Sequence, residues 1–415
     1  MTDNLHFSKR RVAVTGGGIV SSLGSSEEEI FKTLTGRRNC VRLMEEWKKY
    51  TQMNTLLASP VDFAMPDFPR KKIRGMGRVS QLALVATDNA LKTAGLLESG
   101  ELTNGRAGIA FGSSMSSVDG MLDIYGMLVN SDMKSINATT YIRAMPQTCA
   151  VNIEVFYGLT GRIIPCNTAC TSGSIAIGYA YETIKNGIQD IMIAGGADEL
   201  SPVDAAVFDT LFAASANNDH PEATPAAYDV SRDGLVVGEG AGALILEDWE
   251  HAQKRGARIY AEIIGFGTNT DGKHITQPTS ETMSGALRLS LADSGIAPDL
   301  IGYVNTHGTA TEAGDIAESH ATYGVFGRAV PVSTLKNYTG HTLGACGAIE
   351  AWVSIMMMNR GWFIPNINLK NLDARCAPLD YITGEGRNID TNYIMSNNFA
   401  FGGINTSLIF AKRPS

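Results

Sequence analysis

Ile163-Ile164-Pro165-Cys166-Asn167-Thr168-Ala169-Cys170-Thr171-Ser172-Gly173-Ser174 is the stretch from which the architecture can be inferred. It opens on a short apolar run, which suits a buried strand. Small and polar residues follow, and then a helix-forming run that stops at Asn186-Gly187, a good helix end. Cys170 is therefore expected on a tight turn between a strand and a helix. This is the arrangement of a nucleophile elbow, with sulfur in place of the usual serine oxygen.

A cysteine at the start of a helix lies near free backbone N–H groups and the positive end of the helix dipole. Both favour the thiolate, so the pKa of Cys170 is expected to lie below the ~8.5 of a free cysteine. The sequence thus predicts a nucleophilic thiol. The alternative is that Cys170 is a small buried hydrophobic residue, as many free cysteines are.

The composition is that of a globular protein. The 415 residues exceed one ordinary core, so two or three domains or one large double unit are expected. The net charge of −8 argues against nucleic-acid binding through overall charge. The six cysteines form no CxxC pair and indicate reduced cytosolic thiols. The polar N-terminus lacks an apolar signal core and no apolar run reaches ~18 residues, so we expect a cytoplasmic protein without a membrane span.

Strands and helices alternate in both halves of the chain. Strands are expected at residues 11–15, 108–112, 188–194, 257–267, 301–305, 330–333, 393–395 and 406–410, and helices at 79–94, 282–294 and 348–360. Such alternation implies a layered α/β fold with mostly parallel strands. A coarse duplication of the layout predicts two units, residues 1–255 and 256–415.

Gly16, Gly17 and Gly18 follow the first expected strand and suggest a dinucleotide site. The fingerprint needs a third glycine where Ser21 stands, so a tight strand-to-helix turn is the favoured interpretation.

Two further segments leave their roles open. A basic cluster lies between residues 70 and 78, and it is either a solvated face or a docking patch for an acidic partner. Its members are Arg70, Lys71, Lys72, Arg74 and Arg78. Residues 115–127 are loosely apolar, and they line a pocket, form a subunit contact or belong to the core.

Three polar stretches with glycines follow strands in the second half, at residues 304–311, 333–344 and 397–405. Two of the seven histidines, His307 and His341, stand beside glycines there. In an open α/β sheet, such strand ends are where ligands bind. Two histidines with Lys336 and an elbow cysteine favour a catalytic site over a core or capping role.

Four motifs together carry a resemblance to a known family. They are Thr168-Ala-Cys-Thr-Ser-Gly, His307-Gly-Thr-x-Thr, Lys336 with Gly340-His341, and Phe401-Gly-Gly-x-Asn. In this order they closely resemble the β-ketoacyl-acyl-carrier-protein synthases, most of all the elongating 3-oxoacyl-ACP synthase II type. The resemblance runs from Arg11 to Phe410. It implies a thiolase-like fold, a five-layer αβαβα double unit that is usually a homodimer.

The resemblance also implies roles for individual residues. Cys170 is similar to the nucleophile that takes an acyl chain from an acyl carrier protein (ACP). His307 and His341 resemble the pair that holds the thioester carbonyl of malonyl-ACP during decarboxylation. The backbone N–H groups of Cys170 and Phe401 resemble the oxyanion hole. Lys336 resembles the lysine beside the histidines, and Glu318 the carboxylate that pairs with it.

Other residues resemble parts of the family that bind substrate or partner. Phe401 resembles a gating phenylalanine, although core packing is the simpler interpretation of Phe401 and Phe399. The candidates for substrate binding are Thr309, Thr311, Phe399 and Thr276, and those for carrier-protein docking are Lys71, Lys72 and Arg74. The resemblance implies no metal and no cofactor beyond the phosphopantetheine that carries the substrates on ACP.

Four positions depart from the family pattern: Ala400, Ile404, Glu312 and Phe212. Relatives commonly have glycine, threonine and proline at the first three, and an arginine that contacts the carrier protein at the last. The departures leave open a ketosynthase of a dedicated polyene or polyketide pathway, paired with a chain-length-factor subunit, in place of fatty acid elongation. A non-catalytic subunit of that kind is disfavoured by the presence of Cys170 and both histidines, and a thiolase by the two-histidine pattern.

Overall fold

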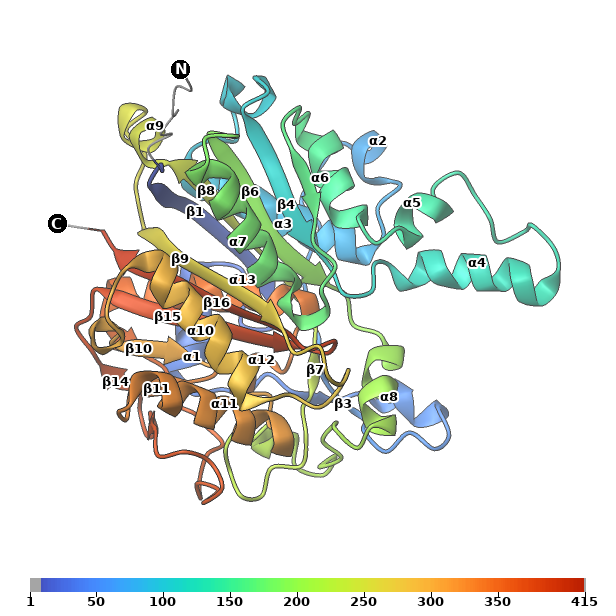
Figure 1. Cartoon of the computed structure of the whole chain (residues 1–415). Helices are drawn as coiled ribbons and strands as arrows, with labels where there is room; N and C mark the ends of the chain where they lie inside the picture. Colours follow the sequence, from blue (N-terminus) through green and yellow to red (C-terminus); the bar gives the residue numbers. More distant parts are fainter. Residues whose placement is uncertain (1–8, 414–415) are drawn as a thin grey trace.

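The computed structural model describes residues 9–413 of the chain (Figure 1). The polar N-terminus, on which the expected lack of a secretion signal rests, lies almost wholly outside the described residues. Within residues 9–413, no helix combines the length and the hydropathy that crossing a bilayer would take.

Strands and helices alternate along most of the chain. The strands are β1 (Val12–Ser21), β2 (Arg42–Leu43), β3 (Leu57–Ser59), β4 (Ala107–Gly112), β5 (Ile163–Pro165), β6 (Ile191–Asp198), β7 (Val237–Gly238), β8 (Gly240–Asp248), β9 (Ala261–Thr270), β10 (Tyr303–Asn305), β11 (Pro331–Ser333), β12 (Trp362–Phe363), β13 (Asp380–Tyr381), β14 (Arg387–Asn388), β15 (Tyr393–Ala400) and β16 (Ile404–Lys412).

The helices are α1 (Glu27–Thr35), α2 (Arg70–Ile73), α3 (Arg78–Ala94), α4 (Val118–Asn130), α5 (Thr140–Ala144), α6 (Thr148–Tyr157), α7 (Ser172–Lys185), α8 (Pro202–Thr210), α9 (Trp249–Lys254), α10 (Ser280–Ser294), α11 (Glu312–Phe326), α12 (Lys336–Thr339) and α13 (Cys346–Arg360). Two short 3₁₀ helices matter below, η3 (Ala169–Thr171) and η6 (Leu343–Ala345). Each predicted element corresponds to one of these, although β1 and β15 run six and five residues past the expected ends at residues 15 and 395.

The main sheet has eleven strands in the order β13-β11-β10-β15-β16-β9-β1-β8-β6-β4-β5. The five strands from β1 onward in this order come from the first half of the chain, and the six before it come from the second half. The antiparallel pair of β1 with β9 joins the two groups. The topology thus separates the halves, while a boundary at residues 255 and 256 stays a prediction.

Parallel pairing occupies the outer strands of each group, where helices form the connections. The central strands pair antiparallel, because β8, β9 and β16 run back beside β1, β6 and β15. The sheet is therefore mixed, and the α/β class is confirmed. The carboxyl ends of β4, β5 and β6 and those of β10, β11 and β15 are the ends at which ligands bind in such sheets.

Five layers follow from the helix packing. α7 and α13 pack against each other and against strands of both halves, and their side chains form the largest hydrophobic cluster. α3 and α6 cover the other face of the first-half strands with a second cluster. α10 and α11 cover the second-half strands with a third. α13 is buried all round from Cys346 to Met358, which is the pattern of a helix inside a core.

The glycine triplet lies within β1, so the predicted turn at Gly16–Gly18 is wrong. The strand continues to Ser21 in register with β8. A Cβ on Gly17 would lie 2.2 Å from the ring of Trp352, and one on Gly18 would lie 2.3 Å from the carbonyl oxygen of Ala86. The triplet therefore permits α13 and α3 to approach the strand, and it forms no phosphate loop.

Candidate active site

One cavity of about 440 Å³ brings together five of the six predicted catalytic residues, all but Lys336. Cys170, His307 and His341 all line it. The sulfur of Cys170 and one ring nitrogen of each histidine lie within 4.8 Å of one another. Cys170 follows β5 and His307 follows β10, so the site forms where strand ends of the two halves face each other.

Cys170 lies in η3, directly before α7. The preceding residue, Ala169, has φ 48°, a left-handed conformation that is uncommon for a residue with a side chain. The Ser172 hydroxyl accepts a hydrogen bond from the Thr168 N–H and donates one to the Ala169 carbonyl, which closes the turn. The predicted elbow is confirmed as a strained turn that presents sulfur at a helix start.

The expected direction of the Cys170 pKa is wrong. Burial raises the pKa of the thiol to about 11, which outweighs the lowering by the charge of Lys336 and by the N–H groups of Phe401 and Cys170. Desolvation of a side chain that is only 6% exposed disfavours the anion more than the helix start favours it. The resting sulfur is therefore a neutral thiol. The N–H groups of Phe401 and Cys170 nevertheless lie within hydrogen-bonding reach of the sulfur, and their role as an oxyanion hole for an acyl group carried there stays a prediction.

The two imidazoles share one tautomer. Nδ1 of His341 accepts a hydrogen bond from the N–H of Leu343 at 3.2 Å. The amide nitrogen of Asn398 lies 3.3 Å from Nδ1 of His307 and is its donor. Because Nδ1 accepts in both rings, the proton of each neutral ring is on Nε2. The rings lie at 89° with centroids 5.1 Å apart, so they offer two N–H donors from different directions.

Both histidines stay neutral. Burial lowers the pKa of each well below its usual value, and the positive charge of Lys336 lowers it further. A neutral Nε2–H group donates to an oxygen without first losing a proton. The pair is therefore suited to hold a negative charge that develops on a substrate oxygen.

Lys336 pairs with Glu350, so the predicted pairing with Glu318 is wrong. Its ammonium donates to a carboxylate oxygen of Glu350, and both side chains are almost fully buried. Although burial disfavours the ammonium, Cys346 and Glu350 raise the pKa of Lys336. Asn398 donates to the other oxygen of Glu350 at 2.7 Å and thereby links the ion pair to His307.

Glu318 instead holds the backbone of the histidine loop. Its two oxygens accept hydrogen bonds from the N–H groups of His307 at 2.7 Å and Gly308 at 2.8 Å, and the Tyr228 hydroxyl donates a third at 3.1 Å. Burial raises its pKa to about 7, against the opposing effect of the two N–H groups. Glu318 thus positions the loop that carries His307.

Asp198, Asn398 and Glu350 were missed at the sequence level as parts of the site. Asp198 ends β6 and is buried, and it accepts hydrogen bonds from the Ser113 hydroxyl at 2.7 Å and the Gly344 N–H at 2.6 Å. A signal was present for Asp198, which follows two glycines at a strand end. Glu350 gave no local signal, because it lies in the middle of an apolar helix.

The segment with Thr309 and Thr311 lines the same cavity, and the two hydroxyls lie 2.9 Å apart. Buried Arg232 fixes the end of this segment, with Nη2 donating to the carbonyl of Glu312 at 3.3 Å. Its other end is fixed by Asp315, which accepts from the Ala310 N–H at 3.1 Å.

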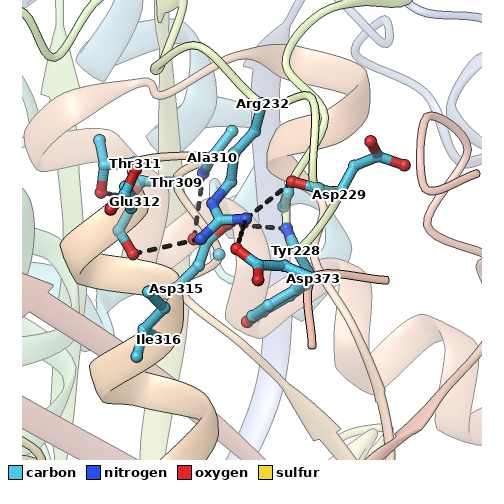
Figure 2. Close-up of polar contacts among 12 residues, drawn as sticks. Tyr228, Asp229, Arg232, Thr309, Ala310, Thr311, Glu312, Asp315, Ile316 and Asp373 are labelled. Atoms are coloured by element: carbon cyan, nitrogen blue, oxygen red, sulfur yellow. Dashed lines mark hydrogen bonds and ion pairs between the residues drawn. The ribbon is translucent and has the colours of Figure 1, made fainter. Parts of the chain in front are cut away.

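Figure 2 shows how Arg232 reaches three chain segments at once. Nη1 donates to the carbonyl of Asp229 at 2.7 Å and to the carboxylate of Asp373 at 2.8 Å. Nε lies 3.4 Å from the carboxylate of Asp315. The network joins the loop after Tyr228, the threonine segment and the Asp373 turn, so it rigidifies one wall of the cavity.

Phe399, Phe401 and Thr276 also line the cavity. Phe399 is buried with its ring edge-on to His307, at 6.1 Å between centroids. Phe401 lies in the turn between β15 and β16, and its ring is 5.3 Å from that of Phe208. Both phenylalanines thus pack against neighbouring rings and also line the site. Of the departures, Ala400 and Ile404 pair with each other and close this hairpin.

The basic cluster lies away from the cavity. Lys72 donates to the carbonyl of Phe156 at 2.7 Å, and Arg78 is bonded to Glu239. Lys71 and Arg74 are exposed on α2, and neither lines the cavity. The cluster is therefore partly used within the fold, and its docking role stays a prediction.

Residues 115–127 mostly belong to α4, which projects from the body of the molecule (Figure 1). This helix exposes apolar side chains, namely Leu122, Tyr125, Met127, Leu128 and Val129. Of the three interpretations, a subunit contact fits this exposure best.

The sequence matches the N-terminal domain of the beta-ketoacyl synthase family over residues 9–252 and its C-terminal domain over residues 260–370. The chain is 37% identical to 3-oxoacyl-[acyl-carrier-protein] synthase 2 of Vibrio cholerae, over 98% of this chain and 100% of that protein.

Solved structures give the same assignment. A crystal structure of a beta-ketoacyl synthase from Burkholderia phymatum is 53% identical with a TM-score of 0.96, covering 98% of this chain and 100% of that one. The ishigamide ketosynthase/chain length factor is 29% identical with a TM-score of 0.88, covering 98% and 100%. These likenesses confirm the thiolase-like ketosynthase fold. The chain belongs to the beta-ketoacyl synthase family of condensing acyltransferases.

Proposed function

We propose that this protein condenses an acyl chain, held on Cys170, with malonyl-ACP to give 3-oxoacyl-ACP in fatty acid elongation. The observation that carries the proposal is the meeting of one buried thiol with two Nε2–H donors inside one cavity. A nucleophile needs a place to carry the acyl group, and a decarboxylation needs donors for the enolate oxygen. Both requirements are met by these three side chains.

In the first half-reaction, the sulfur of Cys170 attacks the thioester carbon of the acyl-pantetheine arm. The carbonyl oxygen becomes an oxyanion between the N–H groups of Cys170 and Phe401. The bond between the carbonyl carbon and the pantetheine sulfur then breaks, and the acyl group stays on Cys170. The proton of the Cys170 thiol ends on the departing pantetheine thiol.

In the second half-reaction, the thioester oxygen of malonyl-ACP accepts hydrogen bonds from His307 and His341. Loss of CO₂ leaves the electrons of the broken C–C bond as an enolate, whose oxygen the two Nε2–H groups stabilise. The enolate carbon attacks the acyl carbonyl on Cys170. The C–S bond breaks, 3-oxoacyl-ACP forms, and the cysteine thiolate takes up a proton from solvent.

This chemistry is complete with side chains, backbone N–H groups and the phosphopantetheine of the carrier protein, so it calls for no metal or organic cofactor. Thr309, Thr311 and Thr276 are proposed to bind the arm, since their side chains line the cavity. Lys336 and Glu350 are proposed to set the field around the histidines.

A second candidate is a ketosynthase of a polyene or polyketide pathway. The likeness to the ishigamide ketosynthase/chain length factor favours it. In both candidates a second subunit covers the apolar face of α4, because a face of this kind marks an interaction site. We propose a homodimer for the first candidate and a heterodimer with a related chain for the second. The six free cysteines support a cytoplasmic location.

The test is a reconstitution from purified protein, acyl-ACP and malonyl-ACP. We expect a mass increase of one acyl group on the peptide that contains Cys170, followed by 3-oxoacyl-ACP when malonyl-ACP is added. Malonyl-ACP should serve as extender and acetyl-coenzyme A should not. An unmodified Cys170 with acyl-ACP present would refute the proposal, and a saturated product profile would separate elongation from polyene synthesis.

A further inference from the structure

The hydroxyl groups of Thr309 and Thr311 are not used to cap the helix that follows them. Thr311 is the N-cap residue of α11, yet its side chain accepts no hydrogen bond from the helix start. The two hydroxyls instead bond to each other at 2.9 Å, and both residues line the catalytic cavity. This bond uses one of the two O–H groups, so the other is left to donate to a ligand in the cavity.

The backbone that carries these hydroxyls has an uncommon shape. Ala310, which lies between the two threonines, has φ 63°, a left-handed conformation that a residue with a side chain rarely adopts. A Cβ on Gly314 would lie 2.5 Å from the hydroxyl oxygen of Thr311, so glycine leaves room for that oxygen. A strained residue persists only where its surroundings fix it. The contacts around Ala310 therefore decide where the two hydroxyls lie.

Asp315 anchors this segment from the first turns of α11. Its carboxylate is fully buried, and one oxygen accepts the N–H of Ala310 at 3.1 Å. The other oxygen accepts the N–H of Tyr228 at 2.7 Å. Tyr228 also has a left-handed backbone, with φ 66°. One carboxylate thus holds two strained residues, and it joins the threonine segment to a loop from the first half of the chain.

Arg232 supplies the positive charge at this anchor (Figure 2). Its side chain is only 2% exposed, and it faces the buried carboxylates of Asp315 at 3.4 Å and Asp373 at 2.8 Å. From the same fork, Nη2 donates to the carbonyl of Glu312, the first residue of α11. A guanidinium offers several N–H groups in one fixed plane, which an ammonium does not. Arg232 therefore sets the position of the helix start that follows Thr311.

We propose that Arg232 is a positioning residue for the pantetheine arm, because it holds Thr309 and Thr311 where their hydroxyls meet an amide group of the arm. The inference rests on the proposed function, since the arm is the part of the substrate that fills this cavity. Arg232 acts on the substrate through the two threonines. Its replacement should therefore weaken the binding of substrates that carry the arm and leave the sulfur of Cys170 as reactive as before.

The test compares Arg232→Lys, which keeps the charge and loses the fork, with the wild-type protein. For malonyl-pantetheine, KM should rise roughly fivefold with little change in kcat, as expected for the loss of about one hydrogen bond. Alkylation of Cys170 by iodoacetamide needs no arm, so its rate should not change. The matched control is Arg375→Lys, the same replacement at a half-exposed arginine that also pairs with Asp373 and lies outside the cavity. This control should keep the wild-type KM.

A double-mutant cycle separates positioning from general support of the fold. The variant Thr309→Val/Thr311→Val lacks both hydroxyls and should by itself raise KM for malonyl-pantetheine. If Arg232 acts through these hydroxyls, adding Arg232→Lys to that variant raises KM no further. A purely structural role would instead multiply the two increases, because independent effects add in free energy.

Multiplied increases in the cycle would overturn the proposal, and so would an unchanged KM in Arg232→Lys. A slower alkylation of Cys170 in this variant would also overturn it, because the disturbance would then extend to the nucleophile. Should Arg232→Lys fail to fold, Asp373→Asn loosens the same guanidinium, and the same cycle applies. Failure of the proposed function would look different, since the wild-type protein would then release no CO₂ from malonyl-pantetheine.

Discussion

The carboxylate of Asp198 accepts the backbone N–H of Gly344 at 2.6 Å, although the two residues stand 146 positions apart in the chain. Asp198 ends β6 on the side of Cys170, and Gly344 follows His341. This hydrogen bond therefore fixes the distance between the nucleophile and one of its two histidines.

Replacing Asp198 with asparagine should weaken this connection. The new NH₂ group faces N–H donors, so at least one buried donor loses its acceptor. We expect a loss of about 2–3 kcal/mol in the free energy of unfolding and a fall in kcat for condensation, measured by urea unfolding and product formation. The control is Asp62→Asn, an exposed partner of Arg42, which should change neither. Equal behaviour of the two variants would contradict the bridging role.

Cys170→Ala should abolish condensation and keep decarboxylation of malonyl-ACP. The two Nε2–H donors remain in place without the sulfur, so the enolate is still stabilised. His341→Ala should lower the rate of CO₂ release by roughly 10²–10³, the usual effect of removing one such donor. The core variant Cys166→Ala should retain both activities. Loss of CO₂ release in Cys170→Ala would show that the cysteine takes part in decarboxylation.

The reactivity of Cys170 should rise with pH over the whole accessible range. Burial raises its pKa to about 11, so the thiolate fraction grows about tenfold per pH unit below that value. Alkylation by iodoacetamide, followed by mass spectrometry of the Cys170 peptide between pH 7 and about 10, measures this. A plateau near neutral pH would mean that the helix start and Lys336 outweigh desolvation.

The buried pair of Lys336 and Glu350 should show strong coupling. Lys336→Met and Glu350→Leu each leave one unpaired charge in the core, and each should cost about 3–5 kcal/mol in the free energy of unfolding. The double variant removes both charges and should cost less than the sum. Denaturant unfolding of the four proteins gives the coupling energy, and additive costs would contradict a direct pair.

Glu318 should make stability depend on pH. Burial raises its pKa from 4.5 to about 7, so the folded chain binds this proton more tightly than the unfolded chain does. Its stabilising contribution is complete below the unfolded pKa and is lost as pH rises through about 7. Relative to Glu318→Gln, the wild-type protein should lose up to about 3 kcal/mol between pH 5 and pH 7.5. If the free energies of unfolding of the two proteins changed with pH in parallel, the titrating group would be a residue other than Glu318.

The nucleophile and the histidines could be located from the sequence because each directly follows a strand and lies in a motif of small residues. Local signals suffice for such positions. The partner of Lys336 could not be located in this way. Glu318 and Glu350 each lie on a helix after a polar loop, and only the packing of α13 in the middle layer determines which carboxylate meets the lysine.

The predicted turn at Gly16–Gly18 and the predicted lowering of the Cys170 pKa were wrong for the same reason. Gly17 lies within a strand because the ring of Trp352 leaves no room for a side chain there. Trp352 comes from the other half of the chain, so the residues next to Gly17 in the sequence do not indicate this contact. The expected pKa of Cys170 used the helix start alone. The decisive influence was burial by both halves together, which is a property of the assembled fold.

Keeping the sulfur protonated at rest has a consequence for durability. Peroxide converts a thiolate to sulfenic acid far faster than it attacks a thiol. We therefore expect the idle enzyme to lose its nucleophile to peroxide more slowly than a cysteine enzyme with a permanently ionised nucleophile. Its exposure to damage is confined to the moment after each product leaves, before the sulfur regains its proton.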